Sequence, residues 1–93
     1  MNALDVTDKP RLRPLRWRWD GEEGQHIAVA VPNPGGIYFL NPSAAKIFAA
    51  CDGTKTVVEL AGILVEAYEI GLEQAVKDTV KVLDLWREMD MLQ

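Results

Sequence analysis

The sequence predicts an α+β domain of winged helix-turn-helix-like order, in which a three-stranded antiparallel sheet is followed by a three-helix bundle. Two observations carry this prediction. In the first third of the chain, large apolar residues alternate with polar or small ones, which is the period-two pattern of half-buried strands. Beyond residue 41, apolar residues instead recur every three or four positions between helix start and stop signals. A chain of 93 residues is long enough for one domain and not for two.

Three short strands are expected, at residues 15–19, 27–31 and 37–40. Arginines alternate with Trp17 and Trp19 in the first, and alanines alternate with Ile27 and two valines in the second. Turn-forming clusters at residues 20–24 and 32–36 separate the strands and favour a meander. The two tryptophans share one face of their strand, where they either join the core or form a dimer contact. A homodimer therefore stays open.

Two of the three helices have explicit start signals. Asn41 is a typical N-cap before a proline at the first helical position, and Gly53 is expected to close that helix in a left-handed conformation. Thr56 and Glu59 have the spacing of a capping box at the start of the second helix. The apolar stripes expected to face the core are Ala44, Ile47, Phe48 and Cys51, followed by Val57, Leu60, Ala61, Leu64 and Tyr68.

The third helix, expected at residues 72–89, has two apolar surfaces. The residues expected on its core side are Leu72, Val76, Thr79, Val80, Leu83 and Trp86. Beside this stripe, Val82, Leu85 and Met89 form a second apolar flank. Such a flank extends the core, contacts a second copy of the chain or walls a groove, and the sequence leaves these three interpretations open.

Composition restricts the class of protein. No stretch approaches the ~20 apolar residues that span a bilayer, so no membrane segment is expected. Residues 1–9 lack the apolar region of a signal peptide and are expected to be flexible, which leaves residues 10–93 as the folded domain. Cys51 is the single cysteine, which precludes an internal disulfide and fits a reducing, cytoplasmic compartment.

Charge argues against nucleic-acid binding. The formal net charge is −4, and the expected third helix carries three basic residues against four acidic ones. A DNA-binding winged helix needs a basic recognition helix, because phosphate contacts supply most of its affinity. Four arginines do gather between residues 11 and 18. They form either a solvated strand edge or a basic patch that meets an acidic partner.

The residues that catalysis would need are missing from the sequence pattern. His26 and Cys51 fall in different elements, and a cysteine on an apolar helical stripe is typically inert packing. No cysteine or histidine spacing typical of zinc or iron–sulfur sites occurs, and no phosphate-binding glycine loop precedes a helix. We therefore expect a protein that is not an enzyme and that has no cofactor and no metal.

Particular segments resemble a known family. The order of Arg16-Trp17-Arg18-Trp19-Asp20, Leu40-Asn41-Pro42-Ser43-Ala44-Ala45 and the segment from Ala50 to Leu60 is similar to the PqqD family, over roughly residues 10–92. The resemblance implies a peptide chaperone that binds a ribosomally made precursor peptide of the PqqA type. It also implies presentation of that peptide to a radical S-adenosylmethionine (SAM) enzyme of the PqqE type, in pyrroloquinoline quinone biosynthesis. The alternative within this resemblance is a leader-peptide recognition element of another ribosomal-peptide pathway.

For the mode of binding, the resemblance implies addition of the peptide as a strand. The third strand of a meander is an edge, where unpaired amides and carbonyls can accept a further strand. An apolar flank on the third helix would supply side-chain contacts next to that edge. The peptide-binding residues expected on this basis are Ile37, Tyr38, Phe39, Leu40, Asp78, Lys81, Val82 and Leu85.

Overall fold

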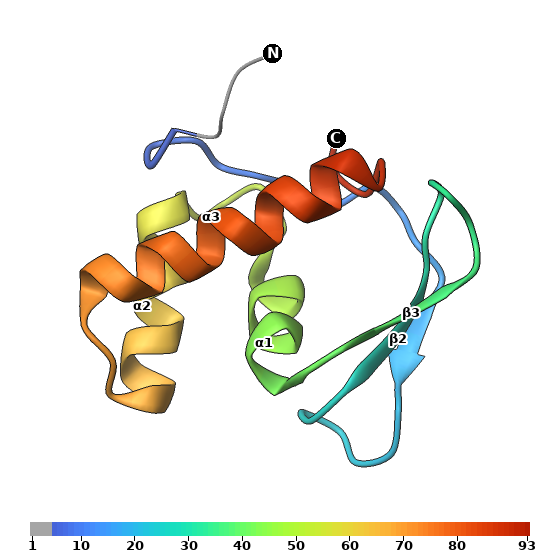
Figure 1. Ribbon diagram of the computed structural model, residues 1–93, viewed down its shortest axis with the longest axis horizontal. Coiled ribbons are helices and arrows are strands. Elements are labelled where there is room, and N and C mark those ends of the chain that lie inside the picture. Colours follow the sequence, from blue (N-terminus) through green and yellow to red (C-terminus); the bar gives the residue numbers. More distant parts are fainter. Residues whose placement is uncertain (1–4) are drawn as a thin grey trace.

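Three strands, β1 (Trp17–Trp19), β2 (Ile27–Ala30) and β3 (Ile37–Leu40), precede three helices, α1 (Pro42–Ala50), α2 (Val57–Tyr68) and α3 (Leu72–Glu88), in the computed structural model, which describes residues 5–93. The strands form one antiparallel sheet in the order β1-β2-β3. This arrangement confirms the predicted α+β order. Helix α1 lies between the sheet and α2 (Figure 1). Helix α3 runs across one side of α1 and α2.

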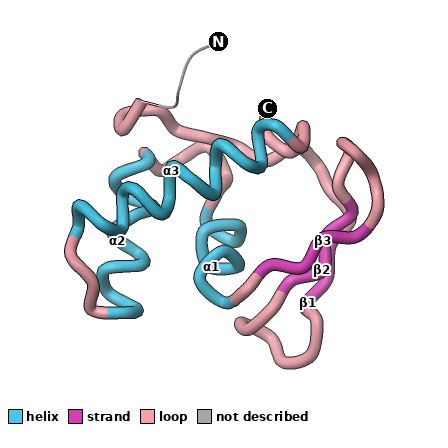
Figure 2. The backbone as a smooth tube through the Cα atoms, in the orientation of Figure 1, coloured by secondary structure: helices cyan, strands magenta, loops and turns pink. Residues whose placement is uncertain are grey.

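The register of the sheet separates an inner from an outer face. Val29 pairs with Trp17 on one side and Tyr38 on the other, and Ile27 pairs with Trp19 and Leu40. These residues face the helices, and Ile27, Val29 and Leu40 are buried. Residues one position along in each strand face outward, because side chains alternate across a sheet. Figure 2 shows that long loops join the strands. β1 and β2 are shorter than predicted, whereas β3 has the predicted bounds.

Aromatic rings connect the sheet to the helices. The ring of Phe48 on α1 lies 5.4 Å from that of Trp17 and 5.8 Å from that of Trp86 on α3, in edge-to-face contacts. Trp19 packs edge-on against Trp17 at 5.6 Å. Such pairs contribute about 0.5–1.5 kcal/mol beyond the area that they bury. Both strand tryptophans therefore contact the inner side of the fold, although Trp17 keeps 45% of its surface exposed.

The predicted caps of α1 and α2 are confirmed. Asn41 Oδ1 accepts a hydrogen bond from the amide of Ala44 at 2.9 Å. At α2 the capping box is complete, with the Glu59 amide donating to Thr56 Oγ1 at 3.1 Å and the Thr56 amide donating to Glu59 Oε1 at 2.8 Å. The bond from the backbone amide of Thr56, followed by the side-chain interaction with Thr56, lowers the pKa of Glu59.

The predicted role of Gly53 at the end of α1 is wrong. The helix ends at Ala50 with Cys51 as its C-cap, and Gly53 follows three positions after the last helical residue. Gly53 does have a positive φ of 86°, and a β-carbon there would lie 3.2 Å from Arg11. Its backbone amide donates to the Pro10 carbonyl at 3.1 Å. A glycine is needed here because the N-terminal segment passes close to this position. The requirement therefore comes from a tertiary contact and not from the end of a helix.

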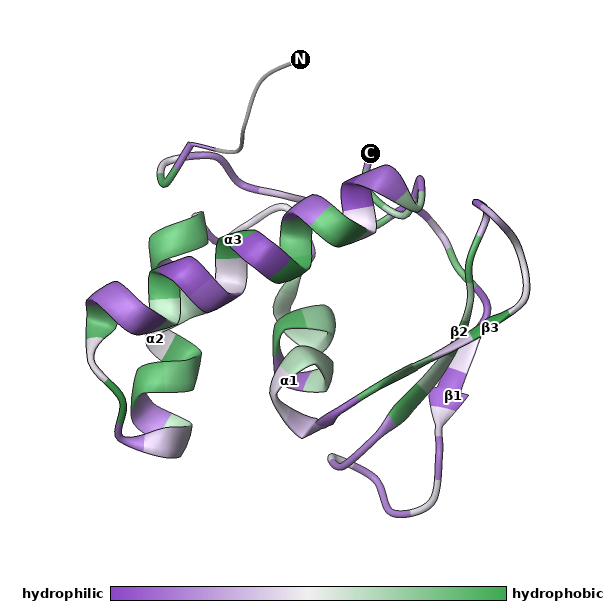
Figure 3. Ribbon diagram, in the orientation of Figure 1, coloured by the Kyte–Doolittle hydropathy of each residue, from purple (hydrophilic) through white to green (hydrophobic). Residues whose placement is uncertain are grey.

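The predicted core face of α3 needs one correction. Thr79, Leu83 and Trp86 are buried as expected, but Leu72 is 50% exposed and Ala75 is fully buried in its place. Helix α3 starts beside the turn that follows α2, at the edge of the molecule (Figure 1), so its first residue has little to pack against. Along its length α3 alternates between hydrophobic and hydrophilic residues, whereas hydrophobic ones predominate in α1 and α2 (Figure 3).

The segment before β1 is held against the C-terminus. The amide of Arg13 donates to the Met91 carbonyl at 2.8 Å, and the amide of Gln93 donates to the Arg11 carbonyl at 2.8 Å. Met91 is fully buried. Closer to the N-terminus, the Asp8 carbonyl accepts a hydrogen bond from the first amide of α2 at 3.0 Å. Residues 1–4 of the segment expected to be flexible lie outside the described residues, and the flexibility of 1–9 stays a prediction.

Candidate functional site

A pocket of about 570 Å³ opens where the end of β3 meets the three helices. This volume is within the ~300–1,000 Å³ range of small-ligand sites. The start of α1 forms one wall, the end of α2 and the following turn form the second, and the middle of α3 forms the third. The lining residues are Asn41, Pro42, Ser43, Ile47, Leu64, Tyr68, Ile70, Asp78, Lys81 and Val82. We call this the helix pocket.

The helix pocket contains three of the site residues predicted from the sequence. Asp78, Lys81 and Val82 line it from α3. Leu85, which follows Val82 by three positions, lies on the same side of α3 because of the helical repeat. Its side chain is 40% exposed, whereas Met89, the third residue of the predicted flank, is buried in the core. The apolar flank is therefore part core and part exposed surface.

The β3 residues predicted to bind a peptide divide between the two faces of the sheet. Tyr38 and Leu40 face inward, with Leu40 buried and Tyr38 packed against the core. Ile37 and Phe39 face outward and are 61% and 60% exposed. None of the four lines the helix pocket, which begins at the next residue, Asn41. In the sheet formed by residues 5–93, β3 pairs with β2 alone, so the backbone groups on its other edge are what β3 can offer a peptide.

Tyr68 and Ile70 also line the helix pocket, although neither was predicted as a site residue from the sequence. Tyr68 was expected in the core but is 42% exposed, and its ring lies 5.9 Å from Lys46 Nζ. Ile70 lies in the turn between α2 and α3 and packs against the core. Tyr68 has the spacing of the α2 stripe but is the last residue of that helix, and Ile70 lies beyond it, so helical spacing does not show that either residue faces a pocket. Both residues face the pocket because of the direction that the chain takes after α2.

Charges at the pocket rim are available to a ligand. Asp78 Oδ1 accepts a hydrogen bond from Gln74 Nε2 at 2.9 Å. Lys81 forms no ion pair with any residue between 5 and 93. Asn41 Oδ1 is already used by the Ala44 amide and by Ser43 Oγ, at 2.9 Å each. The rim therefore offers one free cation and one carboxylate beside an apolar interior.

The geometry around Cys51 does not support a nucleophile. Burial, followed by the charge of Asp52, raises the pKa of the Cys51 thiol to about 12. The thiol donates a hydrogen bond to the Pro10 carbonyl at 3.5 Å. His26 is exposed next to β2, and no hydrogen bond joins it to Cys51. A thiol with such a pKa is protonated at neutral pH and does not attack a carbonyl.

Neither a metal-binding cluster nor a membrane-spanning helix is found among residues 5–93. Residues 5–93 contain no group of three or more histidine, cysteine, aspartate or glutamate side chains placed to hold a metal ion. Among the same residues, no helix combines the length and the apolar character needed to cross a membrane.

Comparison with known proteins agrees on one family. The family described as Coenzyme PQQ synthesis protein D (PqqD) matches residues 25–92. A curated relative from Azotobacter vinelandii, named PqqA binding protein, is 27% identical over 96 residues, which cover 100% of this chain and 98% of the relative. The solution structure of the PqqD truncation of Methylobacterium extorquens PqqCD matches with a TM-score of 0.77 and 25% identity, over 98% of this chain and 95% of that chain. It is described as a functional, stand-alone recognition element for ribosomally synthesised and post-translationally modified peptides.

Proposed function

The chain belongs to the PqqD family, and we propose that it is a peptide chaperone that binds a PqqA-like precursor peptide as a fourth strand beside β3. In this function it has no catalytic activity of its own. It presents the peptide, in the cytoplasm, to a radical SAM enzyme in the synthesis of pyrroloquinoline quinone. The observation that carries the proposal is the free edge of β3, which leads directly into the helix pocket.

The edge of β3 supplies the backbone contacts. In an antiparallel sheet, alternate residues of an edge strand direct both their amide and their carbonyl away from the sheet. A peptide laid beside β3 pairs with these groups whatever its sequence. Two of the four residues of β3 are of this kind, so the edge offers four such bonds, which contribute ~1 kcal/mol each.

The helix pocket supplies specificity. A peptide that continues past Leu40 in the direction of the chain reaches Asn41 and Pro42, which line the helix pocket. Two apolar side chains buried there and against Leu85 contribute ~1.5–3 kcal/mol each. Ordering the peptide costs ~2–5 kcal/mol. The balance has a central value near ~5–6 kcal/mol, which corresponds to a dissociation constant of ~100 µM. An enzyme that holds both partners tightens this value.

The non-catalytic role is supported by the chemistry of the residues. The Cys51 thiol, with its pKa of about 12, is unsuited to nucleophilic attack. The relative from Azotobacter is named for binding and the structure from Methylobacterium for recognition. A coloured preparation of the purified chain, or stoichiometric iron or zinc, would contradict this part of the proposal.

Calorimetry with the organism's own precursor peptide tests binding, with a peptide of scrambled sequence as the control. We expect a dissociation constant in the micromolar range or tighter for the native sequence. Amide chemical shifts should change at Tyr38–Leu40 and at Asp78–Leu85. Absence of heat at high peptide concentration, with and without the enzyme, would refute the function. Shifts confined to β1 and the surroundings of Cys51 would place the peptide elsewhere.

Strand addition has its own test. A peptide in strand pairing directs alternate amides toward β3 and the others toward solvent. Methylation of single peptide nitrogens should therefore weaken binding at every second position of the paired segment and have little effect between them. A uniform effect, or no effect at any position, would show that the peptide does not pair with β3.

A further inference from the structure

A second surface, on the side of the sheet opposite the helices, has no role in the function proposed above. It consists of two rows that run across the three strands. Phe39, Ala28 and Arg18 form one row, as the register shows. In the other row Ile37 pairs with Ala30, whose amide donates to the Arg16 carbonyl at 2.9 Å. We call these six residues the outer face.

The outer face is unusually apolar for an uncovered surface. Ile37 and Phe39 are the most exposed large hydrophobic residues that the structure describes, at 61% and 60%. Ile37 and the two arginines surround the small side chains of Ala28 and Ala30, and together with Trp17 these residues line a hollow of about 380 Å³. The outer face thus has an aromatic and an aliphatic side chain on one flank and two guanidinium groups on the other, a composition enriched at protein interfaces.

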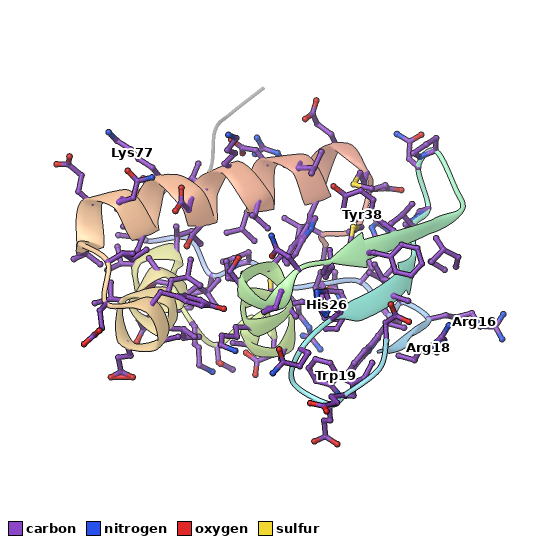
Figure 4. All side chains as sticks on the ribbon, turned by 60° about the horizontal axis from the view of Figure 1, so that its bottom comes forward. Arg16, Arg18, Trp19, His26, Tyr38 and Lys77 are labelled. Carbon is purple, nitrogen blue, oxygen red and sulfur yellow. The ribbon has the colours of Figure 1, made fainter. Side chains whose placement is uncertain are left out.

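The arginines lack sufficient counter-charge. Arg18 Nη1 lies 3.8 Å from Asp20 Oδ1, and both side chains are largely exposed. Arg16 forms no ion pair with any other residue in the described range 5–93. Figure 4 shows both arginines extending away from the helices, at the opposite end of the molecule from Lys77. The chain as a whole is acidic, so this basic surface is a local feature against its net charge of −4.

A second copy of the chain does not satisfy this surface. In a two-fold dimer each outer face meets the same outer face. Its six residues include no carboxylate, so the arginines would meet either arginines or Ile37 and Phe39. Burial of guanidinium groups without a counter-ion is strongly unfavourable. The occupant must bring its own acidic groups.

We infer that the outer face docks a protein partner whose surface has an apolar centre and carboxylates beside it, and that this partner is the radical SAM enzyme of the proposed function. The peptide edge of β3 and the outer face belong to the same strand, so a protein on the outer face lies next to the bound peptide without covering its site. Alternate side chains of a peptide in strand pairing face the same way as Ile37 and Phe39. The docked enzyme therefore meets those side chains directly.

The test compares two double variants of equal charge change. Arg16→Glu/Arg18→Glu alters the outer face, and Lys9→Glu/Lys77→Glu alters exposed lysines elsewhere. Binding of the purified enzyme to the immobilised chain, with peptide present, is measured at low and at physiological ionic strength. We expect the arginine variant to lose at least about tenfold in affinity at low salt and less at higher salt, and the lysine variant to change less than about twofold. Phe39→Ser should weaken enzyme binding at both salt concentrations.

This inference rests on the proposed function, and peptide calorimetry separates the two. Both double variants should bind the precursor peptide with unchanged affinity when the enzyme is absent. Failure of the wild-type chain to bind peptide refutes the function. Retention of enzyme binding by the arginine variant overturns the inference alone. No binding of the wild-type chain to the enzyme overturns the inference and, with it, the presentation step of the proposed function. Loss of peptide binding in the arginine variant also overturns it, because the outer face would then hold the peptide.

A membrane is the other possible occupant of the outer face. If the wild-type chain binds vesicles of phosphatidylglycerol and phosphatidylcholine and the arginine variant does not, the surface binds a membrane and the inference is overturned.

Discussion

Leu83 and Leu85 are two positions apart on α3, and the same substitution should have opposite consequences at the two sites. Leu83 is fully buried, whereas Leu85 is 40% exposed on the side of the helix that carries Val82 and the helix pocket. Leu83→Asp should unfold the protein. Leu85→Asp should leave it folded and weaken the binding of the precursor peptide.

The magnitudes follow from burial. Loss of a buried leucine costs ~2–5 kcal/mol before the penalty of a buried carboxylate is added. A domain of this length has ~5–14 kcal/mol of stability in total, so Leu83→Asp removes most of it. At Leu85, the exposed part of the side chain allows hydration of a carboxylate, and the free energy of unfolding should change by ~1 kcal/mol or less. In the complex the same carboxylate faces apolar peptide side chains, which costs ~2–4 kcal/mol or ~30- to 700-fold in affinity.

Circular dichroism during thermal unfolding and peptide calorimetry together measure both effects. Leu85→Ala is the matched control, since it removes contact area without adding charge and should weaken binding about fivefold. A folded Leu85→Asp variant that binds peptide with native affinity would refute the placement of the peptide on α3. A cooperatively folded Leu83→Asp variant would show that the assigned core face is wrong.

Three further outcomes are expected. Lys81→Glu should weaken peptide binding by ~1 kcal/mol or less in calorimetry, because the lysine is exposed at the pocket rim. Thr56→Ala should lower stability to denaturant by ~1 kcal/mol through loss of the capping box. The pKa of Glu59 is lowered in the folded state, so the carboxylate contributes fully to stability above its unfolded pKa near 4.5. This contribution is lost as the pH falls through the folded pKa. Glu59→Gln should therefore flatten the acid side of a plot of melting temperature against pH.

Alkylation of Cys51 should report on unfolding. With a thiol pKa of about 12, the native protein should react with iodoacetamide at pH 8 on the order of 10³-fold more slowly than the unfolded chain. Mass spectrometry with and without denaturant measures the ratio. Rapid labelling of the folded protein would contradict the burial of this side chain.

Local chemistry in the sequence was sufficient to predict the helices and strands and their order along the chain. The bounds of β3, the cap at Asn41 and the capping box at Thr56 were all predicted, because each depends on residues within four positions of one another. The core stripe of α1 was predicted for the same reason, since its period is a property of the helix itself. The family could be identified from the same segments, which are largely scaffold.

The tertiary structure alone decided which surfaces are available for binding. The sequence pattern grouped Ile37 and Phe39 with Tyr38 and Leu40 as one binding strand, yet the sheet places the first two on the face opposite the helices. Tyr68 and Ile70 contribute to the helix pocket only because the chain turns back after α2. Helical and strand periodicities fix which residues share a face. Which face is covered depends on contacts between segments far apart in the chain, and no local pattern encodes them.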